Sequence, residues 1–191
     1  MNLFGVLSEV YPTLLTGLTM TVKITILSLI IALVIGIFVC LMNISSNIVL
    51  RGIAKFYIWL IRGTPMLVQA FYFYFALPQL VQAVTGSQFR ITVFTASLVT
   101  LALNAGAYIS EIFRGSIESV NKGQMEAGRS LGLNKFQTMR YIIIPQAFKN
   151  VLPALGNELI TLVKETSVVT VIGLRDLTKG AMIVQSKTYQ A

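Results

Sequence analysis

The sequence of 191 residues contains no histidine and a single cysteine, Cys40. Without histidine the chain lacks the commonest general base and metal ligand, and neither a Ser/His nor a Cys/His pair can form. Cys40 has no second cysteine to pair with, which excludes an intrachain disulfide and a thiolate metal site. We therefore expect no catalytic residue and no metal site, and we interpret Cys40 as a packing residue.

Charged residues are also scarce. They make up 12% of the chain, whereas apolar residues make up 55%, and a soluble domain of this composition would have too little polar surface. We therefore expect an all-α integral membrane protein. The formal net charge of +8 comes from basic residues spread between apolar runs, a pattern that favours membrane topology over nucleic-acid binding.

Uncharged stretches divide the chain into segments long enough to cross a bilayer, which takes about 20 residues each. We expect a single transmembrane domain, residues 1–191, with four membrane helices at about 14–42, 55–80, 91–112 and 148–173. Lysine and arginine collect after the first and third of these helices. Because cytoplasmic loops are enriched in these residues, both connections should be cytoplasmic and the N-terminus outside.

The basic loop at 114–147 predicts two short helices separated by a turn. Asn-x-x-Gln sequences begin at Asn121 and at Asn134, and this spacing is typical of a reciprocal cap at a helix N-terminus. Gly132 lies where the first helix must end, a position that favours left-handed backbone geometry. Pro145 then marks the start of the fourth membrane helix.

The second of these short helices is expected to have an apolar face. Phe136, Met139 and Ile143 recur at spacings of three and four residues, which places them in one stripe. Either the cytoplasmic ends of the membrane helices or another protein must cover such a stripe.

The same loop contains a spaced motif, Glu126-Ala127-Gly128, Gly132, Ile142, Ile144 and Pro145. It resembles the EAA loop of the membrane subunits of ABC importers, which docks on the ATP-hydrolysing subunit. Gly128 replaces the usual alanine and Ile144 the usual leucine, and both changes keep a small or an aliphatic side chain. The resemblance implies that the ATPase-coupling residues are Glu126, Ala127, Gly128, Gly132, Phe136 and Pro145.

Further segments narrow the resemblance to the polar amino acid permeases of the histidine, glutamine and arginine type. These segments are Arg62–Pro65 with the aromatic stretch Phe71–Phe75, Asn104–Gly115, Lys122–Gln124 and Leu152–Gly173. With the loop they cover most of the chain. The resemblance implies the type I permease fold of ABC importers, with a fifth membrane helix after Ala191, in the cytoplasmic (inner) membrane of a prokaryote.

The resemblance also implies partners. They are an ABC ATPase dimer, a second permease subunit that is either identical or different, and an extracytoplasmic amino-acid-binding protein, free or fused. The chain has no G-x-x-x-x-G-K-[ST] sequence, so we expect it to bind no cofactor, with ATP and Mg held by the partner ATPase.

Two acidic residues, Glu158 and Glu165, lie in the fourth expected helix. A carboxylate inside a bilayer is costly unless it faces a partner or water. A separation of seven residues places both on one face, roughly 10 Å apart along the axis. We expect this face to contact the ammonium or guanidinium group of an amino acid, and we add Asn157 and Asn104 as candidate substrate-binding residues.

Structural interpretations compete with these assignments. Lys164 or Lys23 can neutralise the two acids in a purely structural network. Glu111 and Arg114, three residues apart, predict a local ion pair, and Pro65 predicts a kink after Arg62.

We therefore predict an alternating-access permease subunit for cationic amino acids, namely arginine, lysine or histidine, with glutamine or another polar amino acid as the alternative substrate. A secondary transporter or channel without an ATPase partner is the alternative of a different class. It would use the same polar helix but would have no need of the docking loop.

Overall fold

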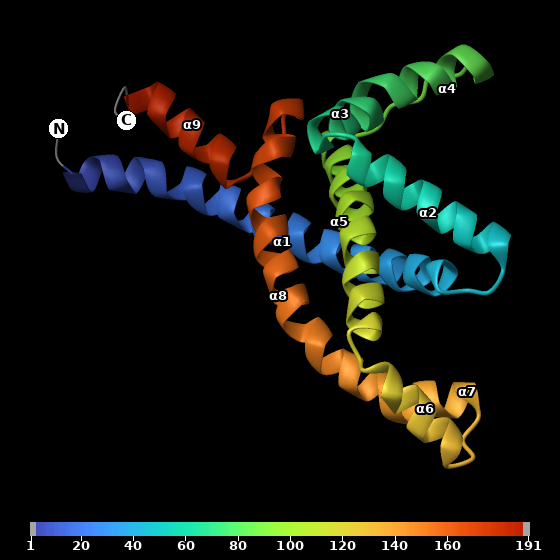
Figure 1. Cartoon of the computed structure of the whole chain (residues 1–191). Helices are drawn as coiled ribbons and strands as arrows, with labels where there is room; N and C mark the ends of the chain where they lie inside the picture. The colour runs from blue at the N-terminus through green and yellow to red at the C-terminus, as the bar shows by residue number, and fades with distance from the viewer. Residues whose placement is uncertain (1–2, 189–191) are drawn as a thin grey trace.

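The computed structural model describes residues 3–188, and the side chains of residues 10–186. The described residues form helices and contain no strand (Figure 1). The longer helices are α1 (Leu3–Asn43), α2 (Ile48–Gly63), α5 (Val93–Glu118) and α8 (Ile144–Val169). The shorter segments are α3 (Met66–Phe71), η1 (Tyr72–Ala76), α4 (Leu77–Thr85), α6 (Lys122–Ser130), α7 (Lys135–Thr138), η2 (Met139–Ile143), η3 (Thr170–Ile172) and α9 (Leu177–Thr188).

The centre of the fold is the crossing of α1 and α5. Glycines let the two helices approach closely, because a Cβ on Gly36 would lie 2.5 Å from Ile109 Cγ2 and a Cβ on Gly106 would lie 2.8 Å from Ile35 Cγ2. The buried core includes Ile24, Ala32, Leu101, Ala105, Ile109 and Leu162. Helix α8 packs beside α5 and also contacts α1 (Figure 1).

Three of the described helical stretches are long and apolar enough to cross a membrane: Val10–Asn43, Met66–Thr85 and Val93–Glu118. Helix α1 has 41 residues, which corresponds to about 60 Å, roughly twice the thickness of a hydrocarbon core. Helix α8 is as long as α5, with 26 residues each, but its charged residues keep it out of this apolar set.

The expected second span at 55–80 is not one helix. The chain leaves helical geometry at Thr64 (φ −117°, ψ 140°), and Pro65 precedes a new helix that starts at Met66. Proline disfavours helical geometry in the residue before it and cannot donate a backbone hydrogen bond. The long apolar stretch therefore begins at Met66, and the sequence-based kink is a full break.

Two π-helical turns occur in the described chain, η1 and η2, and a proline follows each of them after one intervening residue. In both turns the hydrogen bond spans five residues, from Leu77 N to Tyr72 O and from Ile144 N to Met139 O. Pro78 and Pro145 have no N–H, and their rings would clash with a carbonyl of a regular helix. One wider turn moves that carbonyl away and lets the helix continue.

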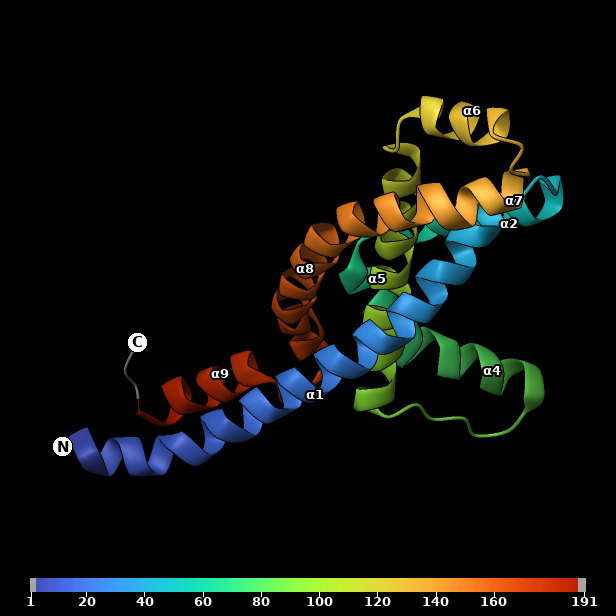
Figure 2. The same ribbon diagram turned by 90° about the horizontal axis from the view of Figure 1, so that it is seen from below.

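The chain after α8 contains a helix that the sequence did not predict. Helix α9 forms at Leu177–Thr188 and packs along the N-terminal half of α1 (Figure 2). The fifth membrane helix expected after Ala191 lies outside the described residues. Asp176 caps it, because its Oδ1 accepts from Lys179 N at 2.9 Å and from Thr170 Oγ1 at 2.6 Å. Asp176 is buried, and its role in the fold is to cap α9.

Candidate functional site

The segment 121–143, which we call the α6–α7 hairpin, projects from one end of the molecule. In Figure 2 it lies at the same end as the C-terminus of α1, whereas α9 lies at the opposite end. The candidate functional features are the exposed side chains and the cavity of this hairpin and the polar residues of α5 and α8.

Helix α6 ends in a Schellman motif at Gly132. The N–H of Leu133 donates to Gly128 O at 3.1 Å and the N–H of Gly132 donates to Arg129 O at 3.0 Å. Gly132 has φ +85° and no atom near the position of a Cβ. The expected left-handed turn is confirmed. Glycine is required at this position because of its backbone conformation, not because a side chain would lack space.

The two expected caps have different outcomes. Asn134 forms the full reciprocal cap, because its Oδ1 accepts from Gln137 N and its own N–H donates to Gln137 Oε1, both at 2.8 Å. Asn121 instead accepts from Gly123 N at 2.8 Å, and Gln124 Oε1 accepts from Gln146 Nε2 at 3.3 Å. The reciprocal part of the first prediction is wrong, because Gln124 is engaged by α8.

The second short helix is not separate from the fourth membrane helix. Helix α7 continues through η2 into α8 without a turn (Figure 2). Pro145 therefore lies at the junction of η2 and α8, not at a fresh helix start. Helix α7, η2 and α8 therefore form one continuous helical stretch from the hairpin into the fourth expected membrane helix.

Gly128 has a packing role inside the hairpin. It is buried, and a Cβ at this position would lie 2.5 Å from Thr138 Cγ2 and 3.1 Å from Ile142 Cδ1. The segment that packs closely against Gly128 is therefore α7 and η2 of this same chain, not a partner protein. Glu126, Ala127 and Gly132 are exposed on the same hairpin and are available to a partner.

The tip of the hairpin exposes large apolar side chains. Leu131 is 81% exposed and Phe136 is 73% exposed. Along the expected stripe exposure falls with distance from the tip, because Met139 is half-buried and Ile143 is buried. At the base of the hairpin, a cavity of about 700 Å³ between the hairpin and the end of α5 is lined by Lys122, Glu126 and Met139.

The two acidic residues of α8 have no cationic partner. Glu158 and Glu165 are both half-buried, and within residues 10–186 neither carboxylate has an ion pair or a hydrogen bond. The alternative of neutralisation by Lys23 is not seen, since Lys23 Nζ lies 5.3 Å from the centroid of the Phe94 ring. Lys164 and Asn157 are exposed on α8.

Asn104 lies in a buried network at the helix break. Its Nδ2 donates to Gln69 Oε1 at 3.2 Å. Gln69 Nε2 in turn donates to Ile61 O at 2.8 Å and to Thr64 Oγ1 at 2.9 Å. This arrangement satisfies backbone groups that the break at Pro65 leaves without helical partners. In the structure, Asn104 therefore stabilises the helix break through its hydrogen bond to Gln69.

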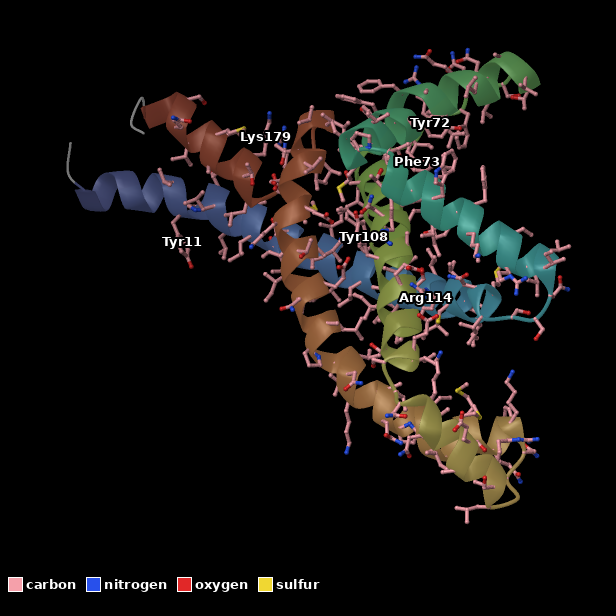
Figure 3. All side chains as sticks on the ribbon, in the orientation of Figure 1. Tyr11, Tyr72, Phe73, Tyr108, Arg114 and Lys179 are labelled. Carbon is pink, nitrogen blue, oxygen red and sulfur yellow. The ribbon has the colours of Figure 1, made fainter. Side chains whose placement is uncertain are left out.

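A charged cluster joins α2 and α5, with Arg114 on α5 as labelled in Figure 3. Glu111 accepts from Arg114 Nε at 3.0 Å and from Arg114 Nη2 at 2.8 Å, so the expected local ion pair is confirmed. Arg114 also pairs with Glu118, and Arg62 Nη1 lies 3.8 Å from Glu111 Oε2. The spacing of charged residues along one helix does not predict the contact between Arg62 and Glu111, because these residues lie on different helices, α2 and α5.

The model of one protein family, described as binding-protein-dependent transport system inner membrane component, matches residues 32–189. The chain belongs to this family. The family predicted from the EAA-like loop is thereby confirmed, and the chain is a transport subunit of an ABC system, not an enzyme.

Relatives of this inner membrane component include two named amino acid permeases. The arginine transport system permease protein ArtQ of Bacillus subtilis (strain 168) is 45% identical over 178 residues, covering 93% of this chain and 78% of its own length. The glutamine transport system permease protein GlnP of Escherichia coli (strain K12) is 40% identical over 180 residues, covering 94% and 80%.

Solved structures agree with the family assignment. An amino acid ABC transporter crystallised with histidines matches with a TM-score of 0.90 and 44% identity over 100% of this chain and 85% of its own. The MetNI methionine ABC transporter in an inward-facing conformation matches with a TM-score of 0.71 and 22% identity, covering 94% and 83%. The second likeness concerns the fold alone. The type I permease fold expected from the sequence is thus confirmed.

Proposed function

We propose that this inner membrane component is the permease subunit of an ATP-driven importer for cationic amino acids, namely arginine, lysine or histidine. The observation that carries the proposal is the pair of half-buried carboxylates on α8, Glu158 and Glu165, which have no cationic partner among the described residues. A carboxylate without a partner in a membrane helix is costly unless a cation or water faces it. A guanidinium or ammonium group supplies that charge.

The two acids have different roles in this proposal. Glu158 accepts hydrogen bonds from the substrate cation, because it lies nearer the middle of α8 (Ile144–Val169). Glu165 is two turns further along the same face and attracts the cation at the end of the helix opposite the hairpin. Asn157 is exposed beside Glu158 and contributes amide donors and acceptors to the amino acid backbone.

Asn104 was proposed from the sequence as a fourth substrate-binding residue. Its buried hydrogen bond to Gln69 favours an indirect contribution, in which it fixes the break between α2 and α3. The substrate set that we retain as direct contacts is therefore Glu158, Glu165 and Asn157.

Transport in this proposal is driven through the α6–α7 hairpin. Leu131 and Phe136 at its tip, with Glu126 and Ala127 beside them, dock on an ABC ATPase dimer that holds ATP and Mg. A second permease subunit completes the path, and an extracytoplasmic binding protein delivers the amino acid. The N-terminus lies outside and the hairpin in the cytoplasm, as the positions of lysine and arginine indicate.

Coupling follows from the continuity of the helix. When ATP binding draws two hairpins together, the displacement passes along α7 and η2 into α8, the helix that carries Glu158. The substrate face is thereby reoriented from one side of the membrane to the other. This is an alternating-access cycle in which the acid face is always attached to the docking element.

Glutamine is the second candidate substrate, because relatives of 40% identity are named glutamine permeases. The glutamine side chain carries no charge, so its recognition would depend on hydrogen bonds and not on a carboxylate. Removing the charge of Glu158 should therefore affect the uptake of a cationic amino acid but not the uptake of glutamine.

The test is uptake by the reconstituted complex with Glu158→Gln. The substitution keeps the size of the side chain and removes its charge. We expect arginine uptake to fall at least tenfold, since a charge-assisted hydrogen bond is lost, while ATP turnover without substrate stays at its original level. Glutamine uptake measured in the same vesicles is the control, and unchanged arginine uptake contradicts the cationic assignment.

A further inference from the structure

A cavity of about 610 Å³ lies between the end of α1, helix α2 and the C-terminal part of α5. Six of its lining residues matter here: Arg51, Lys55, Trp59, Glu111, Arg114 and Glu118. We propose that this cavity, which we call the basic cavity, binds the phosphate group of an anionic phospholipid. The proposal does not depend on which amino acid is transported.

Two cations in the basic cavity are unpaired. Arg51 and Lys55 are four residues apart on α2, so they share one face of that helix. Within residues 10–186 neither side chain has a carboxylate within ion-pair distance. Both residues line the cavity.

The acids of the cavity do not neutralise these two cations. Glu111 pairs with Arg114 and lies 3.8 Å from Arg62, and Glu118 pairs with Arg114. Three basic residues, Arg51, Lys55 and Arg114, and two acids line the cavity. Its net charge is therefore +1, and among the described residues neither Arg51 nor Lys55 is paired with an acid. A phosphate monoanion placed between them would complete the charge balance of the cavity.

The position of the basic cavity favours a lipid phosphate over a soluble one. It lies at the C-terminal end of the apolar stretch Val10–Asn43, and membrane helices meet the lipid headgroups at their ends. On the same helix as the two cations, Trp59 is 69% exposed and Phe56 is 60% exposed, and their rings are 6.0 Å apart. Tryptophan at the edge of a membrane is typical of the headgroup region.

The rest of α2 offers a surface for acyl chains. Ile48, Ile53 and Leu60 are exposed on it as well, so a lipid whose phosphate contacts Arg51 and Lys55 can lay its chains along an apolar face. Basic pockets between membrane helices bind anionic headgroups in this way. A soluble phosphate would gain the charge contacts but not this apolar contact.

Trp59 is the only tryptophan of the chain and reports on the cavity directly. The purified full chain is placed in mixed micelles, and its fluorescence is quenched by phosphatidylglycerol with brominated acyl chains. We expect quenching at a lower lipid fraction than with brominated phosphatidylcholine, which has no net charge. Equal quenching by both lipids would overturn the proposal.

The matched variants assign the effect to the two cations. Arg51→Gln/Lys55→Gln should raise the phosphatidylglycerol fraction needed for half-quenching roughly 30-fold, from the usual contribution of a basic residue near an anionic surface. Arg140→Gln/Lys149→Gln removes two exposed cations that do not line the cavity and should leave the preference intact. A preference that survives the first pair unchanged contradicts the proposal.

Two further arms keep the test decisive. If the double variant does not fold, the exposed Lys55 alone is replaced, and Lys55→Gln should shift half-quenching roughly fivefold. Glycerol phosphate added at millimolar concentration should not displace the brominated lipid. Displacement would show that the cavity takes a soluble phosphate, and the lipid assignment would be wrong.

Discussion

At the residue scale, Gly132 and Gly128 give the α6–α7 hairpin its shape for different reasons. Gly132 has φ +85° with open space around it, so Gly132→Ala costs about 1 kcal/mol of local stability through the backbone alone. We expect faster hydrogen exchange of the α6 amides and weaker substrate-stimulated ATP turnover. Gly132→Asn is the control, because asparagine tolerates left-handed geometry; equal losses in both variants would contradict a conformational role.

Gly128 is limited by space instead. An alanine Cβ would lie 2.5 Å from Thr138 Cγ2, so Gly128→Ala should separate α6 from α7 at a cost of about 1–3 kcal/mol. Thr138→Ser removes that methyl group, and we expect the double variant to regain part of the lost stability. A double-mutant cycle followed by hydrogen exchange measures this coupling. Strict additivity of the two changes would show that the contact is not limiting.

At the element scale, the break between α2 and α3 depends on Gln69, which donates to Ile61 O and Thr64 O. Gln69→Leu leaves these buried carbonyls without donors, and each such loss costs about 1–3 kcal/mol. We expect the apparent melting temperature of the purified chain to fall by several degrees. Gln79→Leu, at an exposed position of α4, is the control and should melt with the native chain; equal melting of both variants would rule out the network.

Sequence reasoning predicted those elements whose signals are local. The cap at Asn134 and the turn at Gly132 followed from residues within one helical turn, and both are confirmed. The sequence predicted a kink at Pro65, whereas the structure has a full break of the helix there. The sequence shows that Pro65 has no backbone N–H to donate, but it does not show how far the chain turns. The π-helical turns before Pro78 and Pro145 were missed for the same reason.

At the scale of the whole molecule, contacts between distant segments were not predictable from patterns. Gln69 and Asn104 are 35 residues apart, and Leu177 N donates to Thr21 Oγ1 across 156 residues. Only the fold brings Arg62 close to Glu111 and places Arg51 and Glu111 in the lining of one cavity, the basic cavity. Accordingly, the sequence alone predicted the two-helix hairpin, whereas it missed the helix break network, the capping role of Asp176 and the basic cavity. The substrate role of the acids of α8 stays a prediction.

The central proposal is that the α6–α7 hairpin docks on an ATPase in the cytoplasm. The most direct measurement is crosslinking of Phe136→Cys in a Cys40→Ala background, which has no other cysteine. Val84→Cys is the control, because the Val84 side chain is also highly exposed, at 86%. We expect a bifunctional thiol reagent to link position 136, and not position 84, to the ATPase subunit in membranes. No product at position 136, or labelling of that cysteine from outside intact cells, would contradict the account.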